Sequence, residues 1–120
     1  MDASIPCGKP VVLEELCPSS PFFTYGSSLR VTGRLQQYDI QTGTATIADG
    51  NAVLKIDTNH LRGLSFRVGS IYQFIGELFQ TDVEGVLQAR AGRIVDGIDM
   101  NLYRETLQLL RRFSADHITI

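Results

Sequence analysis

The strongest indication of the fold comes from Ser28-Leu-Arg-Val-Thr-Gly-Arg-Leu-Gln-Gln-Tyr-Asp39. Apolar and polar side chains alternate along it, which is the period of a half-buried β-strand. The stretch is long for a single strand, and Gly33 near its middle suits a bend where a strand passes between two halves of a barrel. The segment therefore predicts a long strand with a kink.

Shorter strand signals follow this segment. Gln41–Gly43 turns the chain, and Asp49-Gly50 is a strong hairpin signal between two strands expected over Thr44–Ala48 and Ala52–Asp57. Within Thr58–Gly69 the alternation stops, and the apolar residues predict a short helical turn that Gly69 closes.

Two further strands are expected over Ser70–Gln80 and Val86–Val95. Either Asp99 or Asn101 can cap a last helix, whose apolar side chains recur at helical spacing through about His117. Five strands with a short helix between the third and the fourth match the all-β, five-stranded Greek-key barrel of the OB-fold. An SH3-like barrel is the main rival, but the long first strand and the position of the insert favour the OB-fold.

The N-terminal segment differs from the rest of the chain. All four prolines lie within the first 28 residues, which predicts an irregular segment, with a brief strand or helical turn at Val11–Leu16. We therefore expect an N-terminal arm over residues 1–15, a barrel over 16–98 and a C-terminal helix over 99–120.

Composition sets the broad class. The 120 residues suit one domain, and 43% apolar with 20% charged residues is typical of a soluble globular protein. A net charge of −2 excludes a polybasic or strongly acidic tail. No apolar run approaches the roughly 18 residues of a membrane span, and Met1–Pro10 lacks the pattern of a secretory signal. Cys7 and Cys17 are expected to be free thiols rather than one disulfide, which favours the cytosol or nucleus.

Catalytic chemistry is missing from the sequence. His60 and His117 are the only histidines, and neither has a metal-ligand or catalytic motif around it. The carboxylate pairs Glu14-Glu15 and Asp96/Asp99 are typical of solvated surface or of a helix start. The sequence predicts a protein that is not an enzyme and that holds neither a metal nor a cofactor.

The predicted barrel is poorly equipped to bind single-stranded nucleic acid. OB-folds stack bases on aromatic residues of their second and third strands, but Thr44–Asp57 contains none. The loops near Ile40–Gly43 and Thr81–Gly85, which would clamp the strand, are short. Basic residues on the strands could still form a weak patch that binds phosphates. The alternative is that these residues only solubilise the surface or pair with acidic residues. The candidate residues of this patch are Arg30, Arg34, Lys55 and Arg90.

The terminal helix carries more apolar surface than one barrel contact requires. Two adjacent rows of side chains run along it, one containing Leu102 and Leu109, the other Tyr103, Leu107 and Leu110. One row can cover the barrel, and the second would then face water. We favour an interface with a partner over a helix buried wholly on its own barrel.

Three blocks of sequence also resemble a known family. They are Gly26-Ser-Ser-Leu-Arg-Val-Thr-Gly-Arg-Leu-Gln-Gln-Tyr-Asp39, Val68-Gly-Ser-Ile-Tyr-Gln-Phe-Ile-Gly-Glu-Leu78 and Val95-Asp-Gly-Ile-Asp-Met-Asn-Leu102. Over roughly Leu16 to Phe113 the chain is similar to the Ten-one family, the smallest subunits of CST telomere complexes, and most of all to its plant branch.

The resemblance implies a set of partners. Members of the family pair with the OB domain of a Stn-one subunit and join a large CST subunit, much as the smaller subunits of replication protein A pair. The trimer binds telomeric single-stranded DNA in the nucleus, protects chromosome ends and helps polymerase alpha–primase fill in the complementary strand. The family's partner-contacting aromatic and the polar residue one turn later match Phe113 and His117. The predicted partner-binding residues are Tyr103, Thr106, Leu107, Leu110, Arg111, Phe113 and His117.

Two other functions stay open from the sequence. A stand-alone single-strand binder would use the arginines with Tyr38 or Tyr72 nearby. The small subunit of replication protein A shares the architecture, although the three sequence blocks favour it less.

Overall fold

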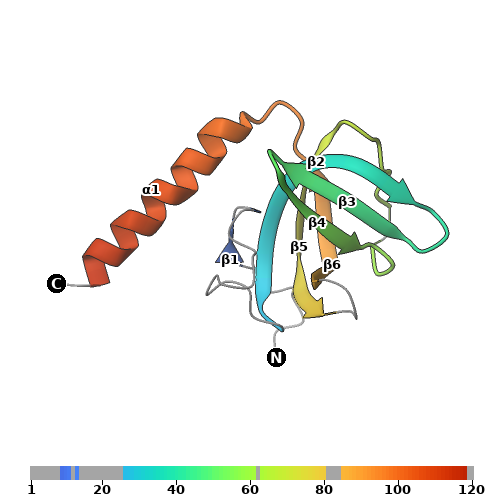
Figure 1. Cartoon of the computed structure of the whole chain (residues 1–120), viewed down its shortest axis with the longest axis horizontal. Helices are drawn as coiled ribbons and strands as arrows, with labels where there is room; N and C mark the ends of the chain where they lie inside the picture. The colour runs from blue at the N-terminus through green and yellow to red at the C-terminus, as the bar shows by residue number, and fades with distance from the viewer. Residues whose placement is uncertain (1–8, 12, 14–25, 62, 81–84, 119–120) are drawn as a thin grey trace.

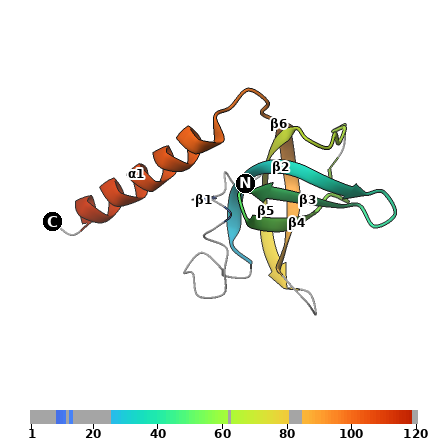
Figure 2. The ribbon, with the colours of Figure 1, turned by 45° about the horizontal axis from the view of Figure 1, so that its top comes forward.

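A computed structural model describes residues 9–11, 13, 26–61, 63–80 and 85–118, without the side chains of residues 9, 80, 111 and 113–118. Its elements form a barrel and one helix that extends away from it (Figures 1 and 2). In chain order they are β1 (Lys9–Pro10), β2 (Ser28–Asp39), β3 (Thr44–Asp49), β4 (Ala52–Asp57), β5 (Ile71–Gln80), β6 (Gly85–Ile94) and α1 (Met100–Ile118). The described helix does not combine the length and the apolar composition needed to cross a membrane.

The long strand β2 closes the barrel because it pairs twice. Its first half runs antiparallel to β5, its second half runs antiparallel to β3, and Arg34 takes part in both ladders. The order β1-β2-β3-β4-β6-β5 returns to β2 through β5, and the parallel β4–β6 pairing makes the sheet mixed. The predicted five-stranded OB-like barrel with a C-terminal helix is confirmed. A Cβ atom at Gly33 would lie 3.1 Å from the Ala48 carbonyl oxygen, so glycine avoids a tight contact where β2 passes from one ladder to the other.

The inward side chains of all five barrel strands form one core. Alternation places them on one face of each strand, as the sequence pattern predicts. Tyr72 is fully buried, and its hydroxyl donates to the Ser65 carbonyl at 2.9 Å and accepts from the Arg67 amide at 2.8 Å. The largest fully buried side chains are Tyr72, Phe74, Leu29, Leu35, Ile47, Ile56, Leu78 and Leu87.

The prediction of a short helix within residues 58–69 is wrong, since the described residues there form turns and bends. Positive φ angles at Gly63 (71°) and Gly69 (97°) interrupt any helix. The Thr58 hydroxyl donates to the Gly43 carbonyl at 2.6 Å, which ties the segment to the β2–β3 turn. Phe66 stacks on Tyr38 with ring centroids 4.5 Å apart, so apolar residues at helical spacing cover the barrel core instead.

Part of the expected N-terminal arm belongs to the barrel. The short strand β1 pairs in parallel with β2, and the Val11 amide donates to the Arg30 carbonyl at 3.0 Å. Val11 and Leu13 are buried in the barrel core. The proline pattern predicts an irregular segment and misses this pairing. Both cysteines lie outside the described residues, and the domain boundaries remain a prediction.

Candidate partner-binding helix and nucleic-acid surfaces

The start of α1 is fixed by two contacts. The Asp99 carboxylate accepts from the amides of Asn101 at 3.0 Å and Leu102 at 3.1 Å, which makes it the N-cap. One turn later Arg104 forms an ion pair with Asp49, a nearly buried carboxylate at the end of β3. The first turns of the helix are therefore anchored to the barrel.

Alongside and beyond these contacts, α1 presents large apolar side chains to solvent. The exposed fractions are 59% for Leu102, 61% for Leu109 and 56% for Leu110. Both views show the helix leaving the barrel rather than lying along it (Figures 1 and 2). A leucine that stays more than half exposed contributes little of the 1.5–3 kcal/mol or so that its full burial would supply.

The predicted partner-binding residues do not all face the same way. Leu107 is only 7% exposed, and Tyr103 is half-buried, so these two turn away from solvent. Thr106 and Leu110 are exposed, and the Thr106 hydroxyl donates to the Leu102 carbonyl one turn back at 2.8 Å. The side chains of Arg111, Phe113 and His117 lie outside the description, and their contacts remain a prediction.

The outer face of β3 and β4 forms the polar groove, about 500 Å³ in volume. None of the described residues that line it is aromatic, so these residues offer no platform on which a base could stack. The Asp39 carboxylate accepts from the Gln41 amide at 2.9 Å, and the Asp57 carboxylate accepts from the Asn59 amide at 3.0 Å. The negative charges of these two carboxylates would repel the phosphates of a nucleic-acid strand. The lining residues are Gln37, Asp39, Thr42, Thr44, Thr46, Lys55, Asp57, Asn59 and Val86.

The predicted basic patch is divided by the structure. Lys55 lines the polar groove, whereas Arg30 lines a separate groove across β2, β5 and β6. Arg34 donates to the Gly69 carbonyl at 2.6 Å, and Arg90 pairs with the Glu77 carboxylate. Arg90 therefore pairs with an acidic residue, which is the alternative to a phosphate-binding patch that the sequence left open.

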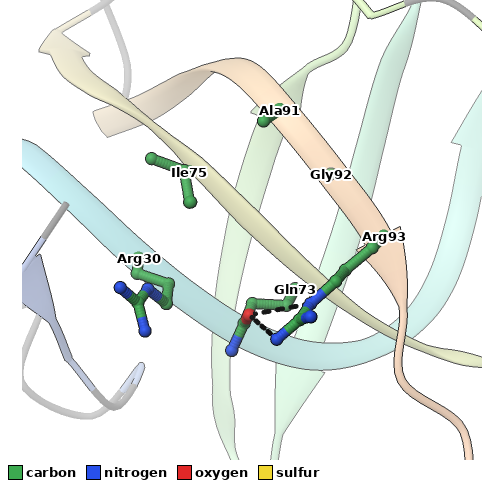
Figure 3. A pocket seen from close by; sticks show the side chains of 6 residues that line it. All are labelled: Arg30, Gln73, Ile75, Ala91, Gly92 and Arg93. Atoms are coloured by element: carbon green, nitrogen blue, oxygen red, sulfur yellow. Dashed lines mark hydrogen bonds between the residues drawn. The ribbon is translucent and has the colours of Figure 1, made fainter. Parts of the chain in front are cut away.

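Sequence reasoning missed Arg93, which shares the second groove with Arg30 (Figure 3). Its Nε and Nη2 atoms donate to the Gln73 side-chain oxygen at 3.2 and 3.0 Å. The signal available in the sequence is the alternation of β6, which puts Ala91 and Arg93 on one face. Only the register across β2, β5 and β6 shows that Arg30 lies on the same outer face, opposite Ile75, which in turn is opposite Ala91.

Neither tyrosine of the stand-alone nucleic-acid hypothesis is free to stack on a base. Tyr72 is fully buried in the core, and Tyr38 is half-buried against Phe66. Among the described residues, no three His, Cys, Asp or Glu side chains gather at a metal-binding distance. Of the two histidines, His60 is exposed and has its Nε2 atom 3.1 Å from the Gln88 side-chain nitrogen.

A closed five-stranded barrel of this topology with a terminal helix defines an OB-fold domain. Residues 4–117 match the family described as telomere-capping, CST complex subunit. The chain is 58% identical over 108 residues to the CST complex subunit TEN1 of Arabidopsis thaliana, which covers 88% of this chain and 85% of that protein. The chain therefore belongs to the Ten1 family of non-catalytic, telomere-capping CST subunits, as the three sequence blocks predict.

Solved structures share the fold at low sequence identity. A chain of the S. pombe Stn1–Ten1 complex has a TM-score of 0.73 and 20% identity, covering 91% of this chain and 96% of that one. A chain of U. maydis replication protein A bound to single-stranded DNA has a TM-score of 0.66 and 15% identity, covering 88% and 91%. These likenesses show the common OB-like barrel.

Proposed function

We propose that this chain is a structural subunit that uses α1 to bind the OB domain of a Stn1-type partner. The observation that carries the proposal is the set of exposed leucines Leu102, Leu109 and Leu110 on a helix that leaves its own barrel. The S. pombe structure of similar fold contains Stn1 together with Ten1, which supports a partner of that kind.

The partner surface extends along the outward row of α1. Leu102, Thr106 and Leu109 lie at successive turns, and Leu110 flanks them. A partner that covers these three leucines would remove their exposed apolar area from water. Full burial of an exposed leucine is worth about 1.5–3 kcal/mol, so each contributes part of that amount before the costs of association. Phe113 and His117 continue the helix toward its end and stay in the proposed contact set through the family resemblance. Tyr103, Leu107 and Arg111 stay in the set because of their positions in the helical pattern.

Within the complex, we assign DNA binding mainly to the partner subunits. The polar groove has no stacking residue and holds two carboxylates, so this barrel contributes little direct affinity. The subunit would stabilise its Stn1-type partner, join the large CST subunit in the nucleus, and so support telomere protection and fill-in by polymerase alpha–primase.

The proposal is tested by co-purification of the full chain with a Stn1-type subunit. We expect Leu110→Glu to reduce recovery of the complex at least tenfold and Phe113→Ala to weaken it, because each removes apolar contact area. Val53→Glu is the matched control, since Val53 on β4 is 55% exposed, close to Leu110 at 56%. Circular dichroism should show all three variants folded. Undiminished recovery with both helix variants would overturn the proposal.

A salt titration separates this function from stand-alone nucleic-acid binding. The full chain alone should bind a telomeric oligonucleotide more weakly than micromolar at physiological salt, since electrostatic binding by a few arginines falls steeply with salt. Micromolar or tighter binding that Arg30→Gln and Arg34→Gln abolish would favour the stand-alone binder.

A further inference from the structure

We infer that the outer face of β2, β5 and β6 binds an extended peptide of a partner protein that carries a carboxylate two residues from a small aliphatic side chain. The site is the arginine groove, about 340 Å³ in volume and separate from α1 and the polar groove. Its lining residues, drawn in Figure 3, are Arg30, Gln73, Ile75, Ala91, Gly92 and Arg93.

The Arg93 guanidinium is held in place by a nearly buried amide. Gln73 is 8% exposed, and its oxygen accepts from both Nε and Nη2 of Arg93. The Gln73 amide nitrogen in turn donates to the hydroxyl of buried Thr32 at 3.1 Å, which fixes the amide orientation. Arg93 is thus oriented before any ligand arrives.

Among the residues that the structure describes, no carboxylate neutralises the positive charge of Arg93. No ion pair joins it to a carboxylate of the described residues, in contrast to Arg90, which pairs with Glu77 on the same outer face. A guanidinium has five donors in a planar fork, and a single amide oxygen engages only two of them. The remaining donors suit the two oxygens of a carboxylate.

The register of the sheet places an apolar surface beside this charge. Arg30 is opposite Ile75 in the β2–β5 ladder, and Ile75 is opposite Ala91 in the β5–β6 ladder. Ala91 and Arg93 are two residues apart on β6, so they share one face at the spacing of alternate strand residues. An extended peptide has the same period and would place a carboxylate at Arg93 and an aliphatic side chain at Ala91.

The lining favours a peptide over a nucleic acid. Ile75, Ala91 and Gly92 give an aliphatic floor with no aromatic ring, so a base could not stack there. The inference does not depend on α1, because none of its residues lines the arginine groove.

The test follows methyl resonances of the labelled full chain during a peptide titration. The probe is an octapeptide of serines with one glutamate and one valine two residues apart. We expect saturable shifts of the Ile75 and Ala91 methyls and none of Val53, which lies on β4. Arg93→Gln should weaken binding at least tenfold, whereas Arg112→Gln, an equal charge change at an exposed helix position, should stay within twofold.

Three results would overturn the inference. They are no shift at millimolar peptide, equal shifts from a peptide with glutamine in place of glutamate, and tighter binding of oligodeoxythymidine at the same methyls. Binding retained in Leu110→Glu would keep this site distinct from the proposed helix interface, and binding lost in that variant would count against the inference.

Discussion

The barrel and helix α1 use their apolar residues in opposite ways. In the barrel, strands from both ends of the sequence turn side chains such as Phe74 and Leu87 into one fully buried core. In α1, Leu102, Leu109 and Leu110 remain more than half exposed, and the helix is anchored near its first turns. The barrel therefore completes its own packing, while the helix leaves its apolar surface for another molecule to cover.

This contrast separates stability from recognition. A substitution in the barrel acts on the free energy of unfolding, because the core is closed on all sides. A substitution on the outward row of α1 acts on the partner, because little intramolecular packing is lost there. Three changes test how complete that separation is.

The largest expected effect is in the barrel, at Gly76. A Cβ atom there would lie 2.1 Å from the Gln88 carbonyl oxygen and 2.8 Å from the Ala89 Cα, both backbone atoms that cannot rotate away. We expect Gly76→Ala to lower the free energy of unfolding by at least about 3 kcal/mol, the upper end for overpacking. Urea unfolding followed by circular dichroism measures this.

Gly50→Ala is the matched control for that change. Gly50 has a φ of 65° in the β3–β4 turn, but a Cβ atom there meets open space. The cost should be only the backbone strain, about 1 kcal/mol. Equal losses for the two variants would show that close strand approach at Gly76 does not limit barrel stability.

An intermediate effect is expected at the joint between the two regions. Arg104→Ala leaves the nearly buried Asp49 carboxylate without its guanidinium partner, which should cost about 1–3 kcal/mol. Amide hydrogen exchange should increase in the first turns of α1 more than in β5. A double-mutant cycle with Asp49→Asn should show coupling of the two residues, and purely additive losses would contradict the anchoring role.

The smallest effect concerns acid stability at Asp96, an exposed residue after β6. The Ile71 amide donates to its carboxylate at 2.8 Å and, with Ser70, Arg67 and Arg34 nearby, lowers the pKa of Asp96 below its ordinary value of 3.8. The stabilisation is present above that ordinary pKa and is lost as the pH falls through the folded pKa. Asp96→Asn should therefore flatten the pH dependence of stability below about pH 4. An unchanged slope in acid denaturation would contradict this assignment.

Most of the barrel is predictable from local periodicity. Alternation locates β2 and the strands after it to within about a residue or two. Of the two predicted helix caps, Asp99 and Asn101, the structure selects Asp99. The segment around Leu64 and Phe66 is not predictable in this way, because its apolar spacing resembles a helix while its side chains cover the barrel core.

The surfaces were harder to predict than the strands. That Leu110 faces solvent and Leu107 does not depends on the direction in which α1 leaves the barrel. The contact of Arg93 with Gln73 depends on the register of β5 and β6. Alternation gives the face on which a residue lies, but it gives neither the neighbour across the sheet nor the angle of a helix.

The double pairing of β2 also sets an order of events during synthesis. Ser28 pairs with Glu77, so the first half of β2 must wait for a distant part of the chain to emerge from the ribosome before its ladder with β5 can form. Helix α1 follows β6 in the chain and emerges after it. The exposed leucines therefore enter solution after all the strands needed to close the barrel have been made. This order shortens the time in which the leucines of α1 could make non-native contacts with the core residues of the barrel.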